Sequence, residues 1–240
     1  MNTRFKDTLT VVLPTYNERG NINRLIQKIL ELKSSHGIPV SVIVVDDNSL
    51  DGTAATIKRK YARNNRVRLI VRLYDKGLAT AIKTGIKEVR SNYVAVMDTD
   101  FNHDPTVLTE MWKLRNSHQM VIGSRYVDNG GMQNRVRYWL SYGFNLFLRG
   151  ILQHTIHDNL SGFFLMKTKY LKQLPTDIIF VGFGDYFIRL IYRARLKKYT
   201  ITEIPVFYKK RMYGTSKSRF LIMLYMYTLT AIRERFSYAH

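Results

Sequence analysis

Short apolar runs alternate with segments of helical periodicity through the first half of the chain. Residues 42–45 read Val-Ile-Val-Val, the continuous apolar run expected of a strand that is buried on both faces. Similar short runs occur at residues 10–13, 67–71, 93–97 and 120–122. The stretches between these runs place apolar side chains on one face of a helix, at residues 21–32, 54–61, 78–89 and 106–114. Repeated strand–helix units of this length predict an α/β fold, in which helices flank both faces of a mainly parallel, Rossmann-like sheet.

The second half of the chain is organised differently. Residues 136–152 are an amphipathic, aromatic-rich helix candidate, and residues 206–218 are a basic loop. Three further elements are predicted, a strand at 163–166, a helix at 185–195 and a strand at 199–204. The chain contains no repeat, low-complexity tract or Gly/Ser/Pro-rich linker, so we expect one continuous domain.

The chain has a formal net charge of +20, from 38 Lys and Arg against 18 Asp and Glu. The excess is concentrated in residues 193–219, where Glu203 is the single acidic residue among many basic ones. This balance favours polyanionic partners, which include nucleic acid, an anionic membrane face and phosphorylated substrates. The absence of cysteine excludes disulfides, thiolate metal sites and a cysteine nucleophile.

Polar clusters follow four of the predicted strands, at the point where each strand ends. They lie at residues 14–18, 46–53, 98–100 and 123–126. In open parallel sheets, ligands bind beyond the carboxyl ends of the strands, which meet at one edge. Turn chemistry alone explains any single cluster, because Asp, Asn, Gly and Pro favour turns. Four clusters at one edge predict a binding site.

Asp98 and Asp100 place two carboxylates on the loop that follows the strand candidate at 93–97. Mg²⁺ and Mn²⁺ prefer oxygen ligands and often bridge protein carboxylates to substrate phosphates. The Asp-x-Asp pattern alone is weakly specific. Its position after a buried strand, in a strongly basic chain, predicts a site for one of these divalent cations.

Six motifs carry a resemblance to a known family. They are PTYNE (14–18), VVDDNSLDGT (44–53), DTDFNHDP (98–105), GSRY (123–126), SGF (161–163) and RMYGTSK (211–217). In this order, over residues 10–219, they resemble family 2 glycosyltransferases of the GT-A fold. Among these they are most similar to polyprenol-phosphate sugar transferases of the dolichol-phosphate mannose synthase kind. The pair Arg137 and Ser141, together with the segment from Arg211 to Lys217, indicates a lipid phosphate acceptor.

The resemblance implies roles for individual residues. The nucleoside pocket is implied to consist of Pro14, Tyr16, Glu18, Val45 and Asp47. The diphosphate and metal are implied to be held by Asp98, Thr99 and Asp100, with Asn102 as a further metal ligand. Contacts to donor and acceptor phosphates are implied for Arg125, Arg211 and Lys217. The resemblance implies that Arg137 and Ser141 bind the lipid phosphate.

The resemblance also implies a division of the chain. Residues 1–218 would be the catalytic domain, with a nucleotide-binding half at 1–127 and an acceptor half at 128–218, and residues 219–240 an apolar and basic helix. Two positions depart from the family pattern. Asn102 stands where relatives often carry the longer Gln. Residues 182–185 lack the lysine and glutamate of relatives, so Asp185 is either a helix N-cap, which we favour, or a partner of a sugar hydroxyl.

The implied reaction is inverting transfer of a sugar to a polyprenyl or dolichyl phosphate, with GDP-mannose as the favoured donor. The acceptor phosphate oxygen is already anionic, so no general base is required, and the protein must align it with the anomeric carbon. Mg²⁺ or Mn²⁺ and the arginines would stabilise the departing nucleoside diphosphate. No histidine is needed in this scheme, and we interpret His103 as a loop residue.

Three alternatives stay open. A UDP-sugar that carries glucose or an N-acetylhexosamine fits the same motifs, because they bind any nucleoside diphosphate. The charge of +20 suits a nucleic-acid-binding protein, although no nucleic-acid motif is present and the strand-end carboxylates would repel a phosphate backbone. A non-catalytic partner subunit is the third alternative, and the intact pair of Asp98 and Asp100 argues against it.

Two apolar segments indicate that the protein attaches to a membrane surface. Residues 1–8 are polar and charged, so no signal peptide is expected. The apolar run at 220–232 lies between Arg219 and Arg233 and is shorter than the about 20 residues that a spanning helix needs. This run and residues 136–152 either lie in a membrane interface or pack on the core. We expect a peripheral protein on the cytoplasmic face of a membrane.

Overall fold

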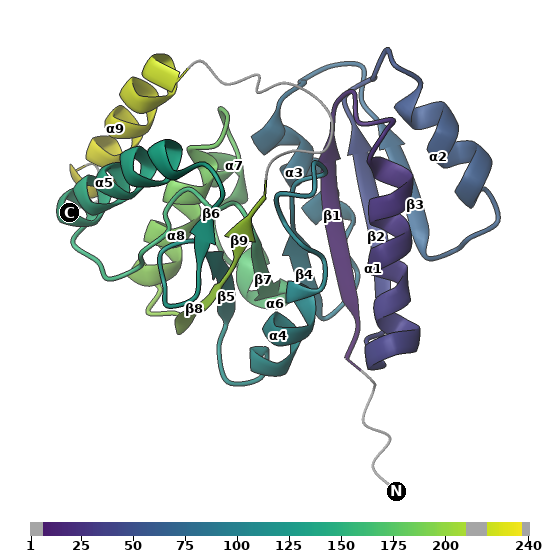
Figure 1. Ribbon diagram of the computed structural model, residues 1–240, viewed down its shortest axis with the longest axis horizontal. Helices are drawn as coiled ribbons and strands as arrows, with labels where there is room; N and C mark the ends of the chain where they lie inside the picture. The colour runs from purple at the N-terminus through teal and green to yellow at the C-terminus, as the bar shows by residue number, and fades with distance from the viewer. Residues whose placement is uncertain (1–6, 210–219, 237–240) are drawn as a thin grey trace, which may run out of the picture.

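Seven strands form the central sheet within residues 7–209 and 220–236, which are the residues that the computed structural model describes. They are β1 (Leu9–Thr15), β2 (Val40–Asp46), β3 (Val67–Val71), β4 (Tyr93–Val96), β5 (Met120–Ser124), β7 (Phe164–Lys167) and β8 (Ile201–Pro205). Their order is β3–β2–β1–β4–β7–β5–β8 (Figure 1). Neighbouring strands run parallel except at β7, which is antiparallel to both β4 and β5. The predicted α/β class with a mainly parallel sheet is therefore confirmed.

The direction of β7 was beyond the reach of the sequence pattern. Phe164 of β7 pairs with Val96 of β4 on one side and with Ile122 of β5 on the other. The sequence predicts a strand at residues 163–166, and three of the four residues of β7 are buried. A strand buried on both faces shows the same apolar run in either direction, so its sequence indicates burial and not orientation.

Alternate residues of the central strands face two separate cores. Val11 of β1 packs in one core, whereas Val12 packs in the other. The first core is covered by α1 (Ile22–His36), α2 (Thr53–Tyr61) and α4 (Val107–Leu114). The second is covered by α3 (Leu78–Glu88), α6 (Thr168–Lys172), α7 (Thr176–Ile179) and α8 (Tyr186–Leu196). Gly85 allows α3 to pack closely on the sheet, because a Cβ atom there would lie 2.4 Å from Val12 Cγ1.

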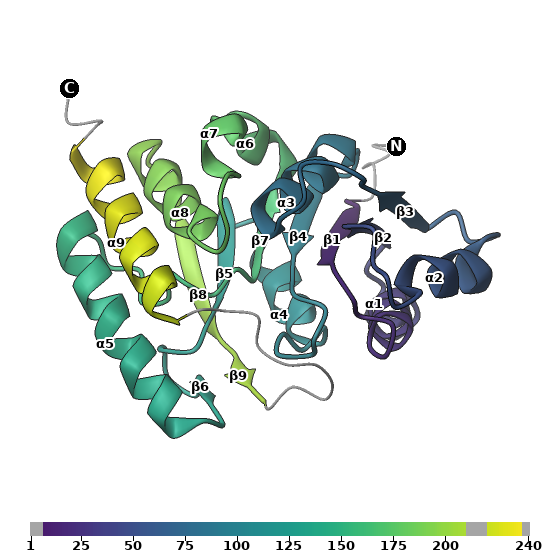
Figure 2. The same cartoon turned by 90° about the horizontal axis from the view of Figure 1, so that it is seen from above.

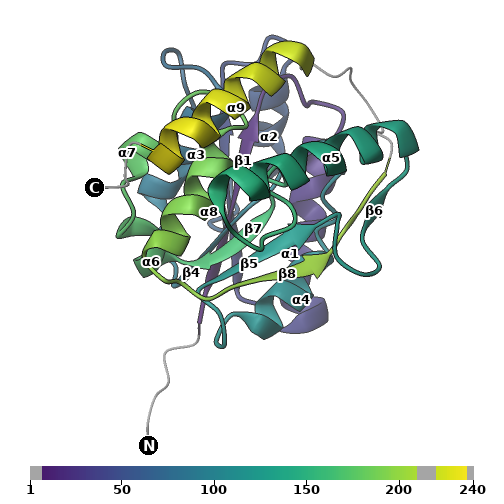
Figure 3. The same ribbon diagram turned by 90° about the vertical axis from the view of Figure 1, so that its left-hand side faces the viewer.

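Two long helices lie side by side at one end of the molecule. They are α5 (Arg135–Leu152) and α9 (Phe220–Phe236), which face the viewer in Figure 3; in Figure 2, α9 lies between α5 and α8. A small third core joins the three helices, made of Leu148, Leu152, Ile188, Tyr192, Tyr227 and Ala231. Near the start of α5, β6 (Gly131–Met132) pairs in parallel with β9 (Phe207–Tyr208). The apolar run predicted at 220–232 is thus part of a longer helix that packs on the domain by one face.

Polar contacts also attach α9 to α8. Arg193 Nε of α8 lies 2.9 Å from Glu234 Oε2 of α9, and both side chains are buried. One to two turns earlier, Asp185 Oδ2 accepts hydrogen bonds from Arg189 Nη2 at 2.5 Å and from Thr230 Oγ1 at 3.0 Å. Asp185 holds the N-cap position of α8, as we favoured from the sequence, but its side chain does not cap the helix. Its carboxylate binds Arg189 and α9 instead.

The length and hydropathy of the helices bear on the membrane prediction. Within residues 7–209 and 220–236, no helix is both long enough and apolar enough to cross a bilayer.

Candidate functional site

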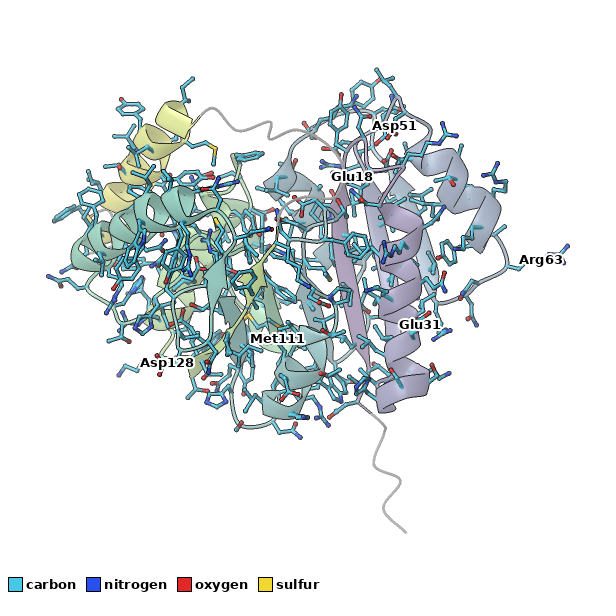
Figure 4. The ribbon with its side chains drawn as sticks, viewed as in Figure 1. Glu18, Glu31, Asp51, Arg63, Met111 and Asp128 are labelled. Atoms are coloured by element: carbon cyan, nitrogen blue, oxygen red, sulfur yellow. The ribbon has the colours of Figure 1, made fainter. Side chains whose placement is uncertain are left out.

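The four predicted polar clusters lie at one edge of the sheet. β1, β2 and β4 run parallel, and β5 has the same direction because β7 is antiparallel to both β4 and β5. The residues that follow these strands therefore gather at the carboxyl edge, as open parallel sheets require. Figure 4 shows Glu18 and Asp51, from two of the clusters, at this end of β1 and β2.

The turns after β1 and β2 are bonded to each other. Asn17 N donates to Ser49 Oγ at 2.8 Å, and Leu50 N donates to Asn17 Oδ1 at 3.1 Å. Glu18 N donates to Thr53 Oγ1 at 3.0 Å, at the first residue of α2. These bonds turn the PTYNE segment and the 46–53 segment into one rigid wall of the candidate site.

Pro14 and Val45 lie next to these turns, near the carboxyl ends of β1 and β2. They pair in register across β1 and β2, and both are buried. Tyr16, by contrast, is 42% exposed at the surface of the turn. Val45 is 0% exposed and packs in the second core, so the exposed Tyr16 ring is the surface here that suits the flat apolar face of a base. The implied nucleoside contacts of Pro14 and Val45 stay predictions.

Asp47 is engaged in a buried ion pair that the sequence analysis did not foresee. Its Oδ1 accepts from Arg72 Nε at 2.7 Å and from Arg72 Nη2, and its Oδ2 accepts from Gly77 N at 2.7 Å. Arg72 also donates to the carbonyl oxygen of Gly77 at 3.0 Å. Asp47 thus joins the turn after β2 to the turn before α3. The one indication of this ion pair in the sequence is that a buried carboxylate needs a cation.

The loop after β4 carries the predicted metal ligands. The Asp98 side chain is 44% exposed, whereas Asp100 is 6% exposed. Asn102 donates to Asp100 twice, from its backbone N to Oδ1 at 3.1 Å and from Nδ2 to Oδ2 at 2.9 Å. The amide nitrogen of Asn102 therefore faces Asp100, so this side chain orients the Asp100 carboxylate, and its role as a metal ligand stays a prediction.

The donor set of this loop fits a hard divalent cation that it shares with a substrate. Two carboxylates are oxygen ligands of the kind that Mg²⁺ and Mn²⁺ prefer, and such sites complete their coordination with phosphate oxygens and water. Among the residues that the structure describes, no group of three or more His, Asp or Glu side chains is arranged to hold a metal by itself. The loop is thus suited to a cation that arrives together with a diphosphate.

His103 is a buried part of this loop, and our interpretation of it as an ordinary loop residue misses this. Its Nδ1 accepts from the backbone N of Asp98 at 2.9 Å, and its Nε2 lies 2.6 Å from Tyr208 Oη. The ring stacks on Phe163 with centroids 4.7 Å apart. Burial lowers the pKa of His103 to about 4, so the imidazole is neutral at pH 7.

The guanidinium of Arg125 forms a buried ion pair, and its implied role toward substrate phosphates stays a prediction. Its Nε and Nη2 each donate to Asp158 at 2.7 Å, and the Arg125 and Asp158 side chains are both buried. Burial alone would lower the pKa of Arg125, but the Asp158 carboxylate outweighs this and raises it. The arginine is therefore a permanent cation in a structural ion pair. Asp158, the carboxylate partner in this ion pair, is not among the residues that the sequence predicts for the site.

Arg137 and Ser141 lie one turn apart near the start of α5. Asn134 caps the helix, since its Oδ1 accepts from Arg137 N at 3.0 Å. Arg137 is exposed and Ser141 is half-buried. The pairing of β6 with β9 brings the chain that leads toward Arg211 next to the start of this helix. Arg211 and Lys217 themselves lie outside the described residues, so their convergence with Arg137 stays a prediction.

Comparison with known proteins adds to this geometry. Residues 10–175 match the family described as glycosyl transferase family 2. The chain is 31% identical over 217 residues to the dolichol-phosphate mannosyltransferase of Pyrococcus furiosus, a match that covers 87% of this chain and 58% of the relative. It is 30% identical over 215 residues to the polyprenol monophosphomannose synthase of Mycolicibacterium smegmatis, covering 86% of this chain and 79% of that protein.

A solved structure has a similar fold. It is glucosyl-3-phosphoglycerate synthase from Mycobacterium tuberculosis in complex with Mn²⁺, uridine diphosphate and phosphoglyceric acid. The likeness has a TM-score of 0.74 at 19% identity and covers 96% of this chain and 79% of that chain. It confirms the predicted GT-A fold. Because the family match spans more than half of the residues and includes the carboxylate loop, the chain belongs to glycosyl transferase family 2.

Proposed function

We propose that this protein transfers mannose from GDP-mannose to the phosphate of a polyprenyl or dolichyl phosphate, with inversion at the anomeric carbon. The observation that carries the proposal is that Asp98 and Asp100 follow β4 at the carboxyl edge of the sheet, the edge that also carries the turns after β1 and β2. The names of the two relatives support the acceptor class and the sugar. The chain spans 58% of the length of the Pyrococcus furiosus relative.

On the donor side, Pro14, Tyr16, Glu18 and Val45, at the ends of β1 and β2, would line the pocket for the base. Asp47 would act indirectly, because its ion pair with Arg72 fixes the turn before α3. Asp98 and Asp100, with Thr99 between them, would hold Mg²⁺ or Mn²⁺ and the diphosphate. The bound cation would neutralise the charge that develops on the leaving nucleoside diphosphate.

On the acceptor side, Arg137 and Ser141 would bind the lipid phosphate. Arg137 offers a planar fork that can bind two phosphate oxygens at once, and Ser141 adds a hydroxyl donor one turn away. Arg211 and Lys217 would complete this group of cations. An anionic phosphate oxygen that is held in line with the anomeric carbon needs no base, and a single displacement inverts the configuration.

The surface of α5 and α9 supports attachment to a membrane. Large apolar side chains are exposed on both helices, namely Val136, Trp139, Leu140, Leu146, Phe147, Ile222, Tyr225, Met226, Ile232 and Phe236. The exposed arginines 135, 137 and 233 border them. Aromatic and aliphatic groups enter the acyl boundary while arginines meet anionic head groups. We propose that this α5–α9 surface rests on the cytoplasmic face of a membrane, where the acceptor phosphate lies.

A donor panel tests the function. Purified protein is incubated with dolichyl phosphate and one of GDP-mannose, UDP-glucose or UDP-N-acetylglucosamine, and the released nucleotide and glycolipid are quantified. We expect GDP and mannosyl lipid, abolition by excess chelator and recovery with Mg²⁺ or Mn²⁺. Release of UDP alone would replace the donor by the UDP-sugar alternative, and full activity in chelator would exclude the cation.

The membrane attachment makes a second prediction. Trp139→Asp combined with Phe147→Asp should reduce sedimentation with anionic liposomes at least about tenfold, because burying each aromatic ring contributes roughly 1.5–3 kcal/mol. High salt should release the wild-type protein in part. The matched control is Leu196→Asp, which changes an exposed apolar residue at the end of α8. Equal sedimentation of the double variant and this control would remove the α5–α9 surface as the attachment site.

The acceptor site makes a third prediction. Arg137→Ala should raise the KM for dolichyl phosphate about tenfold or more, the loss expected for a charge-assisted hydrogen bond of about 1.5–3 kcal/mol. The dissociation constant for GDP should change by less than about twofold, which corresponds to less than about 0.4 kcal/mol. The control is Arg149→Ala, in the last turn of the same helix. An unchanged acceptor KM and kcat in Arg137→Ala would remove this residue from the acceptor site.

A further inference from the structure

A chain of buried and partly buried hydrogen bonds crosses from the Asp98–Asp100 loop to β9. It begins at the backbone N of Asp98, which donates to His103 Nδ1 at 2.9 Å. Because Nδ1 accepts a hydrogen bond, the neutral imidazole holds its proton on Nε2 and donates it to Tyr208 Oη at 2.6 Å. Tyr208 in turn donates to the carbonyl oxygen of Ser161 at 3.1 Å. In this arrangement each group donates in one direction; His103 Nε2 also lies 3.8 Å from Asp98 Oδ2.

The environment of the chain leaves it little freedom. His103 is 0% exposed and Tyr208 is 8% exposed. The Arg125 guanidinium lies over the Tyr208 ring, 4.9 Å from its centroid. Ser161 Oγ donates to the carbonyl oxygen of Gly123 at 2.5 Å, which ties the end of the chain to β5. Water cannot replace a lost partner easily at such a site, so each hydrogen bond is costly to break.

Tyr208 also belongs to the acceptor side of the site. It pairs with Met132 of β6, and its carbonyl oxygen accepts from Gln133 N at 2.9 Å, just before α5 begins. The chain of hydrogen bonds therefore begins on the backbone of Asp98 and passes through Tyr208, which belongs to the strand pair that precedes Arg137. Donor and acceptor react only when their reacting atoms are held next to each other. The Asp98–Asp100 loop and the β6–β9 pair must therefore keep a fixed separation.

We propose that His103 and Tyr208 are positioning residues, which together fix the Asp98–Asp100 loop relative to the acceptor elements at β6 and β9. The inference rests on the proposed function for its catalytic consequence, but the positioning itself is a property of the free protein. Neither residue contacts a reacting atom in this assignment. They act through the backbone of Asp98 and through the β6–β9 pair.

Tyr208→Phe tests the proposal, since it removes the hydroxyl and keeps the ring. The matched control is Tyr93→Phe, another buried tyrosine, whose hydroxyl donates to Asn116 Oδ1 at 2.9 Å at the opposite end of β4. Hydrogen exchange of the ligand-free protein, residues 1–240, is followed in the segment 97–104. We expect exchange at least about tenfold faster in Tyr208→Phe, as the loss of one buried hydrogen bond implies, and no change there in Tyr93→Phe.

Two further measurements separate positioning from general stability. The concentration of Mn²⁺ that half-saturates the protein in the presence of GDP should rise about tenfold in Tyr208→Phe and stay within twofold in Tyr93→Phe. His103→Asn, whose Oδ1 can still accept from Asp98 N, should exchange more slowly in this segment than His103→Leu. Unchanged exchange in Tyr208→Phe would overturn the positioning role. If Tyr208→Phe exchanges faster than wild type as expected, but the wild-type protein transfers no sugar, the proposed function would be overturned and the positioning role would stand.

Discussion

Asp100→Ala should lower kcat at least about a hundredfold, equivalent to about 3 kcal/mol of transition-state stabilisation. The Asp100 carboxylate is 6% exposed and accepts two hydrogen bonds from Asn102, so its orientation is fixed before any substrate binds. A preorganised anion that holds a cation against the leaving diphosphate acts mainly in the transition state. The loss should therefore appear in kcat as well as in the affinity for Mn²⁺.

The measurement is steady-state kinetics with GDP-mannose and dolichyl phosphate at increasing Mn²⁺. Asp104→Ala is the matched control from the same loop. Asp104 Oδ1 accepts from Thr106 N at 3.0 Å and from Thr106 Oγ1 at 2.9 Å, so its removal should lower stability by about 1 kcal/mol without changing kcat. If Asp100→Ala kept more than a tenth of wild-type kcat at saturating Mn²⁺, Asp100 would not be a metal ligand.

Asp158→Asn should reduce the free energy of unfolding by about 3–5 kcal/mol. Asp158 is fully buried and binds Arg125 through both carboxylate oxygens. Asparagine keeps the shape but leaves the Arg125 cation buried without a counter-charge. Its oxygen can satisfy only part of what the carboxylate accepts, which also includes the backbone N of Arg125 at 3.0 Å.

Urea unfolding of the wild-type protein and of Asp158→Asn measures this difference in the free energy of unfolding. Asp177→Asn is the control, because Asp177 also forms an ion pair, with Lys83 Nζ at 2.7 Å, but its side chain is 77% exposed. Exposed pairs contribute about 0–1 kcal/mol, so this variant should unfold almost like wild type. Similar unfolding free energies for both variants would show that Arg125 is not held as a structural ion pair, and would return it to the set of phosphate ligands.

Periodicity and strand-end chemistry were enough to predict most of the fold and the edge of the site. The run at 42–45 became part of β2, and Asp98 and Asp100 follow β4 as expected. These features depend on residues that are neighbours in sequence, where spacing alone determines which face a side chain occupies. The elements that periodicity missed are very short, such as β6 and β9, each of two residues.

Pairings between distant residues were not predictable in the same way. Arg125 and Asp158 are 33 positions apart, and His103 and Tyr208 are 105 positions apart. A buried arginine or histidine requires a hydrogen-bond partner, but its neighbours in sequence do not identify that partner. For this reason the sequence indicates neither Asp158 as the partner of Arg125 nor Tyr208 as the partner of His103.

The place of β7 has a consequence for how sequence can be exchanged between members of this family. β7 belongs to the half that we assign to the acceptor, yet it lies between β4 and β5 of the nucleotide half. A fragment that ended at residue 127 would leave both of those strands with an open edge in the middle of the sheet, which invites aggregation. A chimaera that joins two relatives at this point would have to match β7 to foreign strands on both sides. Acceptor preference is therefore better transplanted through α5 and the β6–β9 pair than by exchange of whole halves.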